Sequence, residues 1–143
     1  MFRRERGRLW KIARHHYFEV LFQPMRNQAR FASGWYEPQI EGMNESRWMA
    51  AQSTTILPPA SARQRLRLRF HVPAALRGSA VTISLNGKVV DRIGAESSDV
   101  SREYEVDGDV SNVLELSIDR TIEEAGRPHG LRLHSLGWGP ASS

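Results

Sequence analysis

Histidines and carboxylates are the residues of this sequence best suited to acid–base or metal chemistry, because the chain contains no cysteine. His129 and His134 are five residues apart, which is a weak spacing for metal ligands without a third donor. Glu123 and Glu124 are adjacent but stand in a polar, turn-rich stretch, where acidic side chains are ordinarily solvated. The sequence therefore predicts no catalytic site, no metal site and no cofactor, and we expect a protein that is not an enzyme.

Aromatic residues gather in residues 34–48, which hold two of the four tryptophans. A β-sandwich that binds sugar would do so with exposed aromatic faces beside amide or charged groups. The candidate glycan-binding residues are Trp35, Tyr36, Asn44, Arg47 and Trp48. The structural alternative places Trp48 in the core and Trp35 across one end of the sandwich. Burial is the favoured interpretation, because large aromatic side chains bury much area.

Positive charge is concentrated at the start of the chain. Residues 1–31 contain eight Lys/Arg and two Asp/Glu, a balance of +6, while the remaining residues balance at −2. Apolar residues recur at helical spacing over residues 9–21, which predicts an amphipathic helix that ends before Pro24. The candidate docking residues of this arm are Arg3, Arg4, Arg6, Arg8, Trp10, Lys11, Arg14, Tyr17 and Phe22.

Several partners would fit such an arm. A basic amphipathic segment can dock on an anionic membrane surface or on another protein subunit. It can also cover one end of its own domain or stay disordered. Nucleic acid is disfavoured as a partner, because the rest of the chain offers no second basic patch and no recognisable nucleic-acid motif.

Residues 65–72 show the clearest alternation in the sequence. Leu66, Leu68, Phe70 and Val72 point one way, and Arg65, Arg67, Arg69 and His71 point the other. This pattern predicts a strand with one buried and one solvated face. Three arginines on one face suggest a phosphate or acidic ligand, but a solvated face whose arginines pair with glutamates of a neighbouring strand is favoured.

Further strands are predicted at 48–57, 81–85, 88–93, 102–106, 113–118 and 131–136, with Asn86-Gly87 as a type I′ hairpin turn between two of them. We expect a linker at 28–33, a loop at 34–48 and a polar connection at 120–130. The fold class predicted is all-β: an antiparallel β-sandwich, jelly-roll or immunoglobulin-like, with about seven to eight strands. The sandwich would occupy residues 32–143, after the arm of residues 1–31.

A family resemblance adds to this pattern. The order Gly34-Trp35-Tyr36-Glu37-Pro38, Arg47-Trp48, Asn86-Gly87 and Leu-Glu-Leu-Ser-Ile-Asp at 114–119 resembles β-sandwich accessory domains attached to bacterial glycosyltransferases and related surface-polysaccharide enzymes. The resemblance covers roughly residues 34–138. It implies a non-catalytic, carbohydrate-associated sandwich. Those domains usually accompany a catalytic domain, whereas this sequence carries the basic arm.

Two functions follow from these features. The first is an accessory or structural subunit that docks through its arm on a larger, membrane-associated assembly. The alternative is a carbohydrate-binding module linked to bacterial polysaccharide or glycosyltransferase systems. The absence of cysteine, of an apolar run near the roughly 20 residues that span a bilayer and of a secretory signal favours a cytoplasmic protein, with peripheral contact at the cytoplasmic face of the membrane.

Overall fold

The computed structural model describes residues 23–24, 29–42, 44–60, 64–94, 96 and 98–140. The helix predicted over residues 9–21 and all docking residues predicted in the arm lie outside this part of the chain. Within the described residues, no helix is long and apolar enough to cross a membrane.

The described chain is built from strands and one short 3₁₀ turn. The elements are β1 (Gln23–Pro24), β2 (Arg30–Trp35), β3 (Gln39–Glu41), β4 (Asn44–Leu57), β5 (Gln64–His71), η1 (Ala74–Leu76), β6 (Ala80–Leu85), β7 (Lys88–Gly94), β8 (Asp99–Glu105), β9 (Asn112–Ile118), β10 (Ile122–Glu124), β11 (Arg127–His129) and β12 (Arg132–Pro140). The pairs between these strands are antiparallel, which confirms the all-β, antiparallel class predicted from the alternation.

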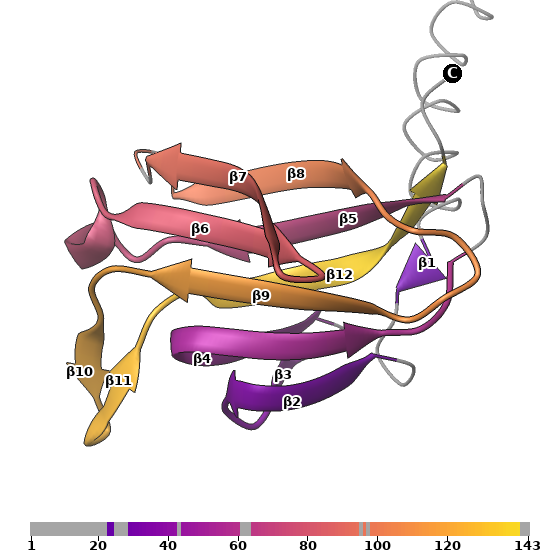
Figure 1. The fold of residues 1–143 in the computed structure, drawn as a ribbon. Helices are drawn as coiled ribbons and strands as arrows, with labels where there is room; N and C mark the ends of the chain where they lie inside the picture. Colours follow the sequence, from indigo (N-terminus) through magenta and orange to yellow (C-terminus); the bar gives the residue numbers. More distant parts are fainter. Residues whose placement is uncertain are drawn as a thin grey trace, which may run out of the picture.

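The strands form two layers that face each other (Figure 1). Hydrogen-bonded neighbours follow the order β7-β6-β9-β4-β12-β5-β8. Strands β7, β6 and β9 lie in front of β8, β5 and β12 in Figure 1, and we call these layers the front sheet and the back sheet. Strand β4 belongs to both, because Arg47 and Trp48 pair with β12 whereas residues 52–57 pair with β9. The architecture is a β-sandwich.

The core lies between the two sheets and comes from the alternation of each strand. Its back-sheet members include Leu66, Leu68, Phe70 and Leu133, and its front-sheet members include Val81, Ile83, Leu85, Leu114, Leu116 and Ile118. Each of these side chains is at most 6% exposed. Burying one such side chain stabilises the fold by about 1.5–3 kcal/mol. The other side of each strand carries the polar residues, as predicted for residues 65–72.

The hairpin predicted at Asn86-Gly87 is confirmed. Asn86 and Gly87 have φ of 54° and 80°, the left-handed conformation that a type I′ turn requires at both central positions. The Asn86 amide donates to Oδ1 of buried Asn112 at 2.8 Å, and its carbonyl oxygen accepts from the Val113 N–H at 2.8 Å. The turn is thereby tied to strand β9 as well as to β6 and β7.

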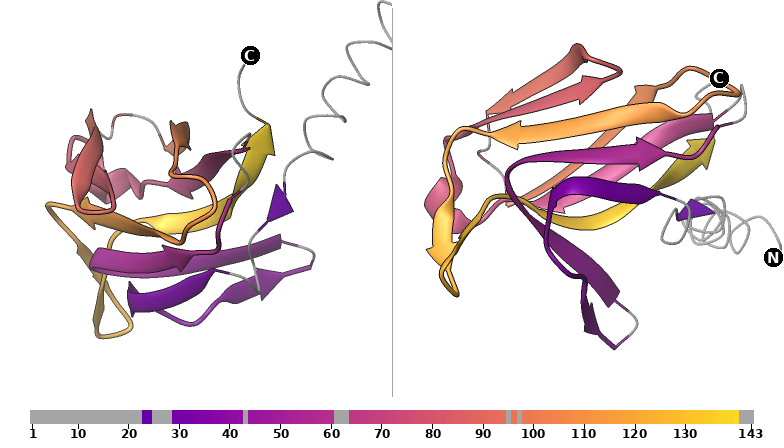
Figure 2. Two further views of the ribbon diagram at one scale, coloured as in Figure 1. Left: turned by 45° about the vertical axis from the view of Figure 1, so that its right-hand side comes forward. Right: turned by 60° about the horizontal axis from the view of Figure 1, so that its bottom comes forward.

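Two segments predicted as irregular are strands. The linker predicted at 28–33 largely overlaps β2, and the loop predicted at 34–48 contains β3 and the start of β4. The loop was predicted because Pro38, Gly42, Asn44 and Ser46 disfavour a regular element, but the positive φ of 62° at Gly42 instead turns the chain between β3 and β4. Gly34, with φ of 76°, bends the chain within β2. The β3–β4 hairpin that results projects from the body of the sandwich (Figure 2, right).

The connection predicted at 120–130 is also partly regular. Residues 122–124 pair with residues 127–129 as the β10–β11 hairpin, around a turn at Ala125 and Gly126. An Ala-Gly turn has no distinctive sequence signal, because alanine rarely adopts positive φ. With β2, β3, β10 and β11 included, the described residues form more strands than the about seven to eight predicted.

Candidate functional site

The outer face of the back sheet, which is the side turned away from the core, carries a row of functional side chains. Trp48 of β4 pairs with Arg132 of β12, Arg132 pairs with His71 of β5, and His71 pairs with Asp99 of β8. Register partners in a sheet lie side by side on one face. The row therefore runs across the back sheet, from the aromatic side chain of Trp48 on β4 to the carboxylate of Asp99 on β8.

Two of the three arginines predicted to share this face lie beside carboxylates of β8, whereas Arg69 lies beside Ser101. Arg65 and Arg67 are register partners of Glu105 and Glu103, and Nε of Arg67 lies 2.9 Å from Oε1 of Glu103. Arg67 packs closely on β12, because a Cβ atom at Gly139 would overlap its Cδ and lie 2.9 Å from its Cγ. The predicted pairing with glutamates of a neighbouring strand is confirmed for Arg67.

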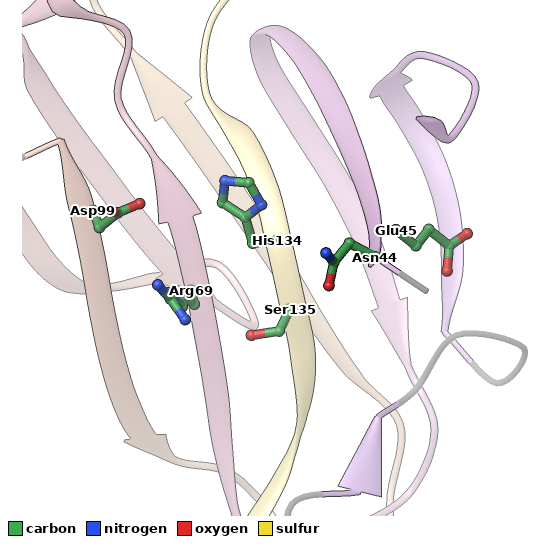
Figure 3. A pocket seen from close by; sticks show the side chains of 6 residues that line it. All are labelled: Asn44, Glu45, Arg69, Asp99, His134 and Ser135. Atoms are coloured by element: carbon green, nitrogen blue, oxygen red, sulfur yellow. The ribbon is translucent and has the colours of Figure 1, made fainter. Parts of the chain in front are cut away.

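A polar hollow opens farther along the same face (Figure 3). Its volume is about 520 Å³, and it is lined by Asn44, Glu45, Arg69, Asp99, His134 and Ser135. These residues belong to β4, β5, β8 and β12. Figure 3 shows the side chains of β4 on one side of β12 and those of β5 and β8 on the other. The lining offers hydroxyl, amide, imidazole, guanidinium and carboxylate groups, so the hollow can both donate and accept hydrogen bonds.

A β-bulge in β12 supplies one of the lining residues. Leu133 pairs with Phe70 and Ser135 pairs with Arg69, so His134 is an extra residue between two consecutive pairs. A bulge redirects the side chain it adds. His134 follows buried Leu133 and is exposed, and because of the extra residue Ser135 lies on the outer face as well, opposite Arg69, before Leu136 returns to the core.

The bulge brings His134 close to two residues of the row. The rings of His71 and His134 have their centroids 6.1 Å apart, and Nδ1 of His71 lies 3.6 Å from Oδ1 of Asp99. Partial burial lowers the pKa of His134, and its electrostatic interactions with Arg132 and His71 lower it further, against the opposing effect of Asp99. The imidazole of His134 is therefore uncharged near neutral pH.

An aromatic cluster closes the other end of the row. The His129 ring lies 4.9 Å from the Tyr36 ring and 5.2 Å from the Trp48 ring, measured between centroids. The guanidinium of Arg127 lies 4.3 Å from the centre of the Tyr36 ring, and that of Arg132 lies 5.7 Å from the centre of the Trp48 ring. The β10–β11 hairpin positions this cluster, because it carries both Arg127 and His129.

Hydrogen bonds fix the two arginines of the cluster. Arg127 pairs with Glu37 at 3.1 Å, and this hydrogen bond is the main reason that the pKa of the Glu37 carboxyl is lowered. Nε of Arg132 donates to Oγ of Ser46 at 2.8 Å, and its Nη2 donates to Oε1 of Gln39 at 3.3 Å. Arg132 thus links the aromatic cluster to the projecting β3–β4 hairpin.

The structure divides the five predicted glycan-binding residues into two groups. Asn44 lines the hollow, and Tyr36 and Trp48 belong to the aromatic cluster. Trp35 instead packs against the core and donates from Nε1 to Oγ1 of Thr55 at 3.0 Å. Arg47 lies over the Phe31 ring at 4.2 Å and donates to the Tyr36 carbonyl oxygen at 2.9 Å.

The core position expected for Trp48 is wrong. Trp48 is partly buried and lies on the side of β4 opposite to Met49, which is 0% exposed. A loop was predicted before residue 48, so the sequence did not fix which face of β4 each residue occupies.

Several residues of this face were not predicted as site residues: Arg69, Asp99, Arg127, His129, Arg132, His134 and Ser135. Sequence analysis paired His129 with His134, but His129 is buried in the aromatic cluster while His134 lies beside His71 and Asp99. Asp99 and His134 lie close together because of the register between β5 and β8 and the bulge in β12, and no local sequence pattern predicts either feature. The alternation of residues 65–72 did suggest a ligand for the arginines, Arg69 among them, but pairing with glutamates was the favoured interpretation.

A second hollow of about 430 Å³ lies over the front sheet, lined by Ser33, Gly34, Gln52, Ser53, Thr54, Ser84, Glu115, Leu116 and Ser117. The described residues that line it carry no aromatic ring and only one charged group, Glu115. The back-sheet face is therefore the stronger candidate for a binding site.

Comparisons with known proteins identify the fold. No protein-family model and no curated protein sequence matches the chain. Among solved structures, it is similar to a family 35 carbohydrate-binding module from Clostridium thermocellum, with 10% identity, a TM-score of 0.51 and coverage of 84% of this chain and 97% of that one. It is also similar to a two-domain esterase active on acetylated mannans, with 13% identity, a TM-score of 0.51 and coverage of 85% of this chain and 37% of that one. This chain therefore resembles, in fold, the β-sandwich modules attached to glycan-active enzymes.

Proposed function

We propose that this protein is a non-catalytic carbohydrate-binding module that holds its glycan on the outer face of the back sheet. The observation that carries the proposal is the polar hollow next to the aromatic cluster. The likeness in fold to a carbohydrate-binding module supports it. The hollow of about 520 Å³ falls within the range of about 300–1,000 Å³ that is usual for ligand sites.

The groups in the hollow suit the hydroxyl groups of a sugar. Each hydroxyl is both a donor and an acceptor, so it needs donors such as Arg69 and acceptors such as Asp99 at the same site. Asn44 and Ser135 supply both functions. Glu45 and Asp99 bring two negative charges to the lining, against the one permanent positive charge of Arg69. This balance favours a neutral glycan over an acidic one.

The aromatic cluster extends the surface beyond the hollow. Trp48 lies four residues from Asn44 along β4, which corresponds to roughly 13 Å of extended strand. A glycan of several sugar units could therefore contact the hollow with one unit and the partly exposed Trp48 with another. An aromatic ring contributes apolar contact area to such a ligand at little cost in side-chain entropy.

The test is a glycan array followed by calorimetric titration of the best ligand. We expect Asn44→Ala and Arg69→Ala each to weaken binding about tenfold or more, because each removes hydrogen bonds to the ligand. Arg67→Ala is the matched control: Arg67 lies two residues from Arg69 on the same face but pairs with Glu103. If the wild-type protein binds no glycan on the array, or if Arg67→Ala weakens binding as much as Arg69→Ala, the proposal fails.

A further inference from the structure

Three potential metal ligands meet on the outer face of the back sheet. One ligand atom from each of His71, Asp99 and His134 lies within 4.8 Å of the other two. The three residues come from three neighbouring strands, β5, β8 and β12. We infer that His71, Asp99 and His134 form a binding site for a divalent transition-metal ion such as Zn²⁺.

The backbone holds all three residues in place. His71 and Asp99 are register partners in the β5–β8 ladder, so their side chains leave neighbouring strands on the same face. His134 is the extra residue of the β12 bulge, whose flanking residues pair with Phe70 and Arg69 of β5. Sites built on strands are held more rigidly than sites built on loops.

The type of donor indicates the type of metal. Two imidazole nitrogens and one carboxylate oxygen suit Zn²⁺, Ni²⁺, Co²⁺ and Cu²⁺. Calcium and magnesium prefer shells made of oxygen alone, and this cluster offers one oxygen-bearing side chain among three. The site should therefore bind transition-metal ions more tightly than calcium or magnesium.

The distances are within reach of coordination. Ligand atoms around a tetrahedral zinc ion stand about 3.4 Å apart, given bonds of about 2.0–2.1 Å. The His71–Asp99 pair, at 3.6 Å, is already near that spacing. The largest separation, 4.8 Å, must shrink by about 1.4 Å. The side chains of His71 and Asp99 are 36% and 54% exposed, so they have room to rotate.

Some of the surrounding charges attract a metal cation, and others repel it. Asp99 supplies a negative charge directly, and Glu45 adds another from across the hollow. Arg69 and Arg132 oppose a cation, since Arg69 lines the same hollow as Asp99 and His134 and Arg132 is the register partner of His71. Arg132 is also held away toward Ser46, Gln39 and Glu41.

Three protein ligands leave at least one coordination position open. A zinc ion with three protein ligands ordinarily completes its shell with water or an exchangeable ligand. Asp99 and His134 both line the hollow, so the open position would face it. The inference concerns the metal alone and does not depend on whether a glycan occupies the same face.

The experiment is calorimetric titration of the full-length protein with Zn²⁺, repeated with Co²⁺ to record the visible d–d absorption of the bound ion. His15 and His16 are changed to Gln in every variant, because adjacent histidines elsewhere in the sequence could bind metal themselves. We expect one ion per chain and a tetrahedral or five-coordinate Co²⁺ spectrum. His71→Gln, His134→Gln and Asp99→Asn should each weaken Zn²⁺ binding about tenfold or more.

The matched control is Glu103→Gln, which neutralises another carboxylate of β8 that faces the same way but pairs with Arg67. It should leave Zn²⁺ affinity within about twofold, since distant charges are screened. Saturating Zn²⁺ should also raise Tm in the control but not in His134→Gln, because a ligand that binds only the folded state stabilises it. Absence of binding at millimolar Zn²⁺, or equal losses in Glu103→Gln and His134→Gln, would overturn the inference.

Discussion

Gly34 of strand β2 lies so close to strand β4 that no side chain fits at this position. A Cβ atom at this position would overlap the carbonyl oxygen of Gln52 and come within 2.7 Å of Cα of Ser53. Both obstacles are backbone atoms of β4, so neither can rotate away. The backbone of Gly34 also has φ of 76°, which L-residues adopt at a cost of about 1–2 kcal/mol.

Gly34→Ala should therefore destabilise the protein by about 3–5 kcal/mol, since it adds a backbone collision to the conformational cost. Gly126→Ala is the matched control: Gly126 has the same φ of 76°, but nothing lies within 4 Å of the added Cβ. It should cost only about 1 kcal/mol. Urea unfolding measures both, and equal losses would show that β2 does not approach β4 as described.

Tyr104 links the two edge strands of the sandwich. Its hydroxyl donates to Oδ2 of Asp91 at 2.7 Å, so a residue of β8 in the back sheet contacts a residue of β7 in the front sheet. Arg102 lies 3.5 Å from the same carboxylate. Partial burial raises the pKa of Tyr104 well above its usual value of 10.0, and the hydrogen bond to Asp91 raises it further.

This raised pKa predicts how stability depends on alkaline pH. Above about pH 10 the unfolded chain loses the Tyr104 proton while the folded protein keeps it, so folding becomes less favourable as pH rises. Tyr104→Phe should cost about 1 kcal/mol at pH 7, through the lost hydrogen bond. The stability advantage of wild type over Tyr104→Phe should then shrink above pH 10, by at most about 1.4 kcal/mol per pH unit.

Denaturant unfolding of both proteins from pH 7 to pH 11 measures this difference. Lysines and the other tyrosines are common to both proteins and cancel in the comparison. An advantage that stays constant across that range would mean that the Tyr104 hydroxyl is not held by Asp91 in the folded state.

At the scale of the element, the β12 bulge is a removable insertion. Leu133 and Ser135 already pair with the consecutive residues Phe70 and Arg69, so deleting His134 would leave a regular antiparallel ladder. The residues after the deletion would keep their faces, with Leu136 still directed into the core.

We expect deletion of His134 to preserve cooperative unfolding with Tm within about 5 °C of wild type, since the core is unchanged. Deletion of Glu115 is the control, because residues 112–117 of β9 pair regularly with β4 and the core residues Leu116 and Ile118 follow it in the strand. Removing a residue from a regular ladder turns every later side chain to the opposite face, so that variant should unfold. Circular dichroism with thermal melting compares them. A collapse of the His134 deletion would contradict the assigned register.

The sequence predicted those elements whose own residues alternate. Strands β5 and β9 were predicted within a residue or two, because Leu66, Leu68 and Phe70, like Leu114 and Leu116, mark the buried face without reference to any neighbour. Strand β2 was missed because its residues pair with β4 around the bend at Gly34, and a glycine suggests a break when its partner strand is not known.

The candidate site was less predictable than the fold. Tyr36, Asn44 and Trp48 were named as candidates because aromatic and amide residues carry a compositional signal, and the structure places them on the candidate face. The meeting of His71, Asp99 and His134 depends on the pairing of β5 with β8 and on one extra residue in β12. Neither the strand register nor the extra residue can be predicted from the local propensities of the residues involved.

At the scale of the whole molecule, the proposed binding face and the basic arm are separate in sequence. The residues of the face run from Tyr36 to Ser135, whereas the predicted docking residues end at Phe22. The docking function of the arm remains a prediction, as do its membrane or protein partner and the location at the cytoplasmic face.

Deletion of residues 2–22 separates the two functions. We expect glycan affinity to stay within about twofold of wild type, because the residues of the hollow and the aromatic cluster all lie outside the deleted segment and exposed charges are screened by salt. Recovery with a membrane fraction or a partner complex should fall if the arm docks. Unchanged recovery would remove the docking hypothesis, and a loss of glycan affinity would place part of the binding face in the arm.

Strand β4 is a shared member of both layers, and this has a mechanical consequence. A fluctuation that separates β4 from β12 acts on the same continuous strand that pairs with β9 in the front sheet. Opening at this ladder is therefore coupled to the front sheet, whereas opening between β12 and β5 is not. A ligand that contacts both β4 and β12 would stabilise the shared ladder, because a ligand that binds only the closed form favours it, and β4 would transmit that stabilisation to the opposite layer.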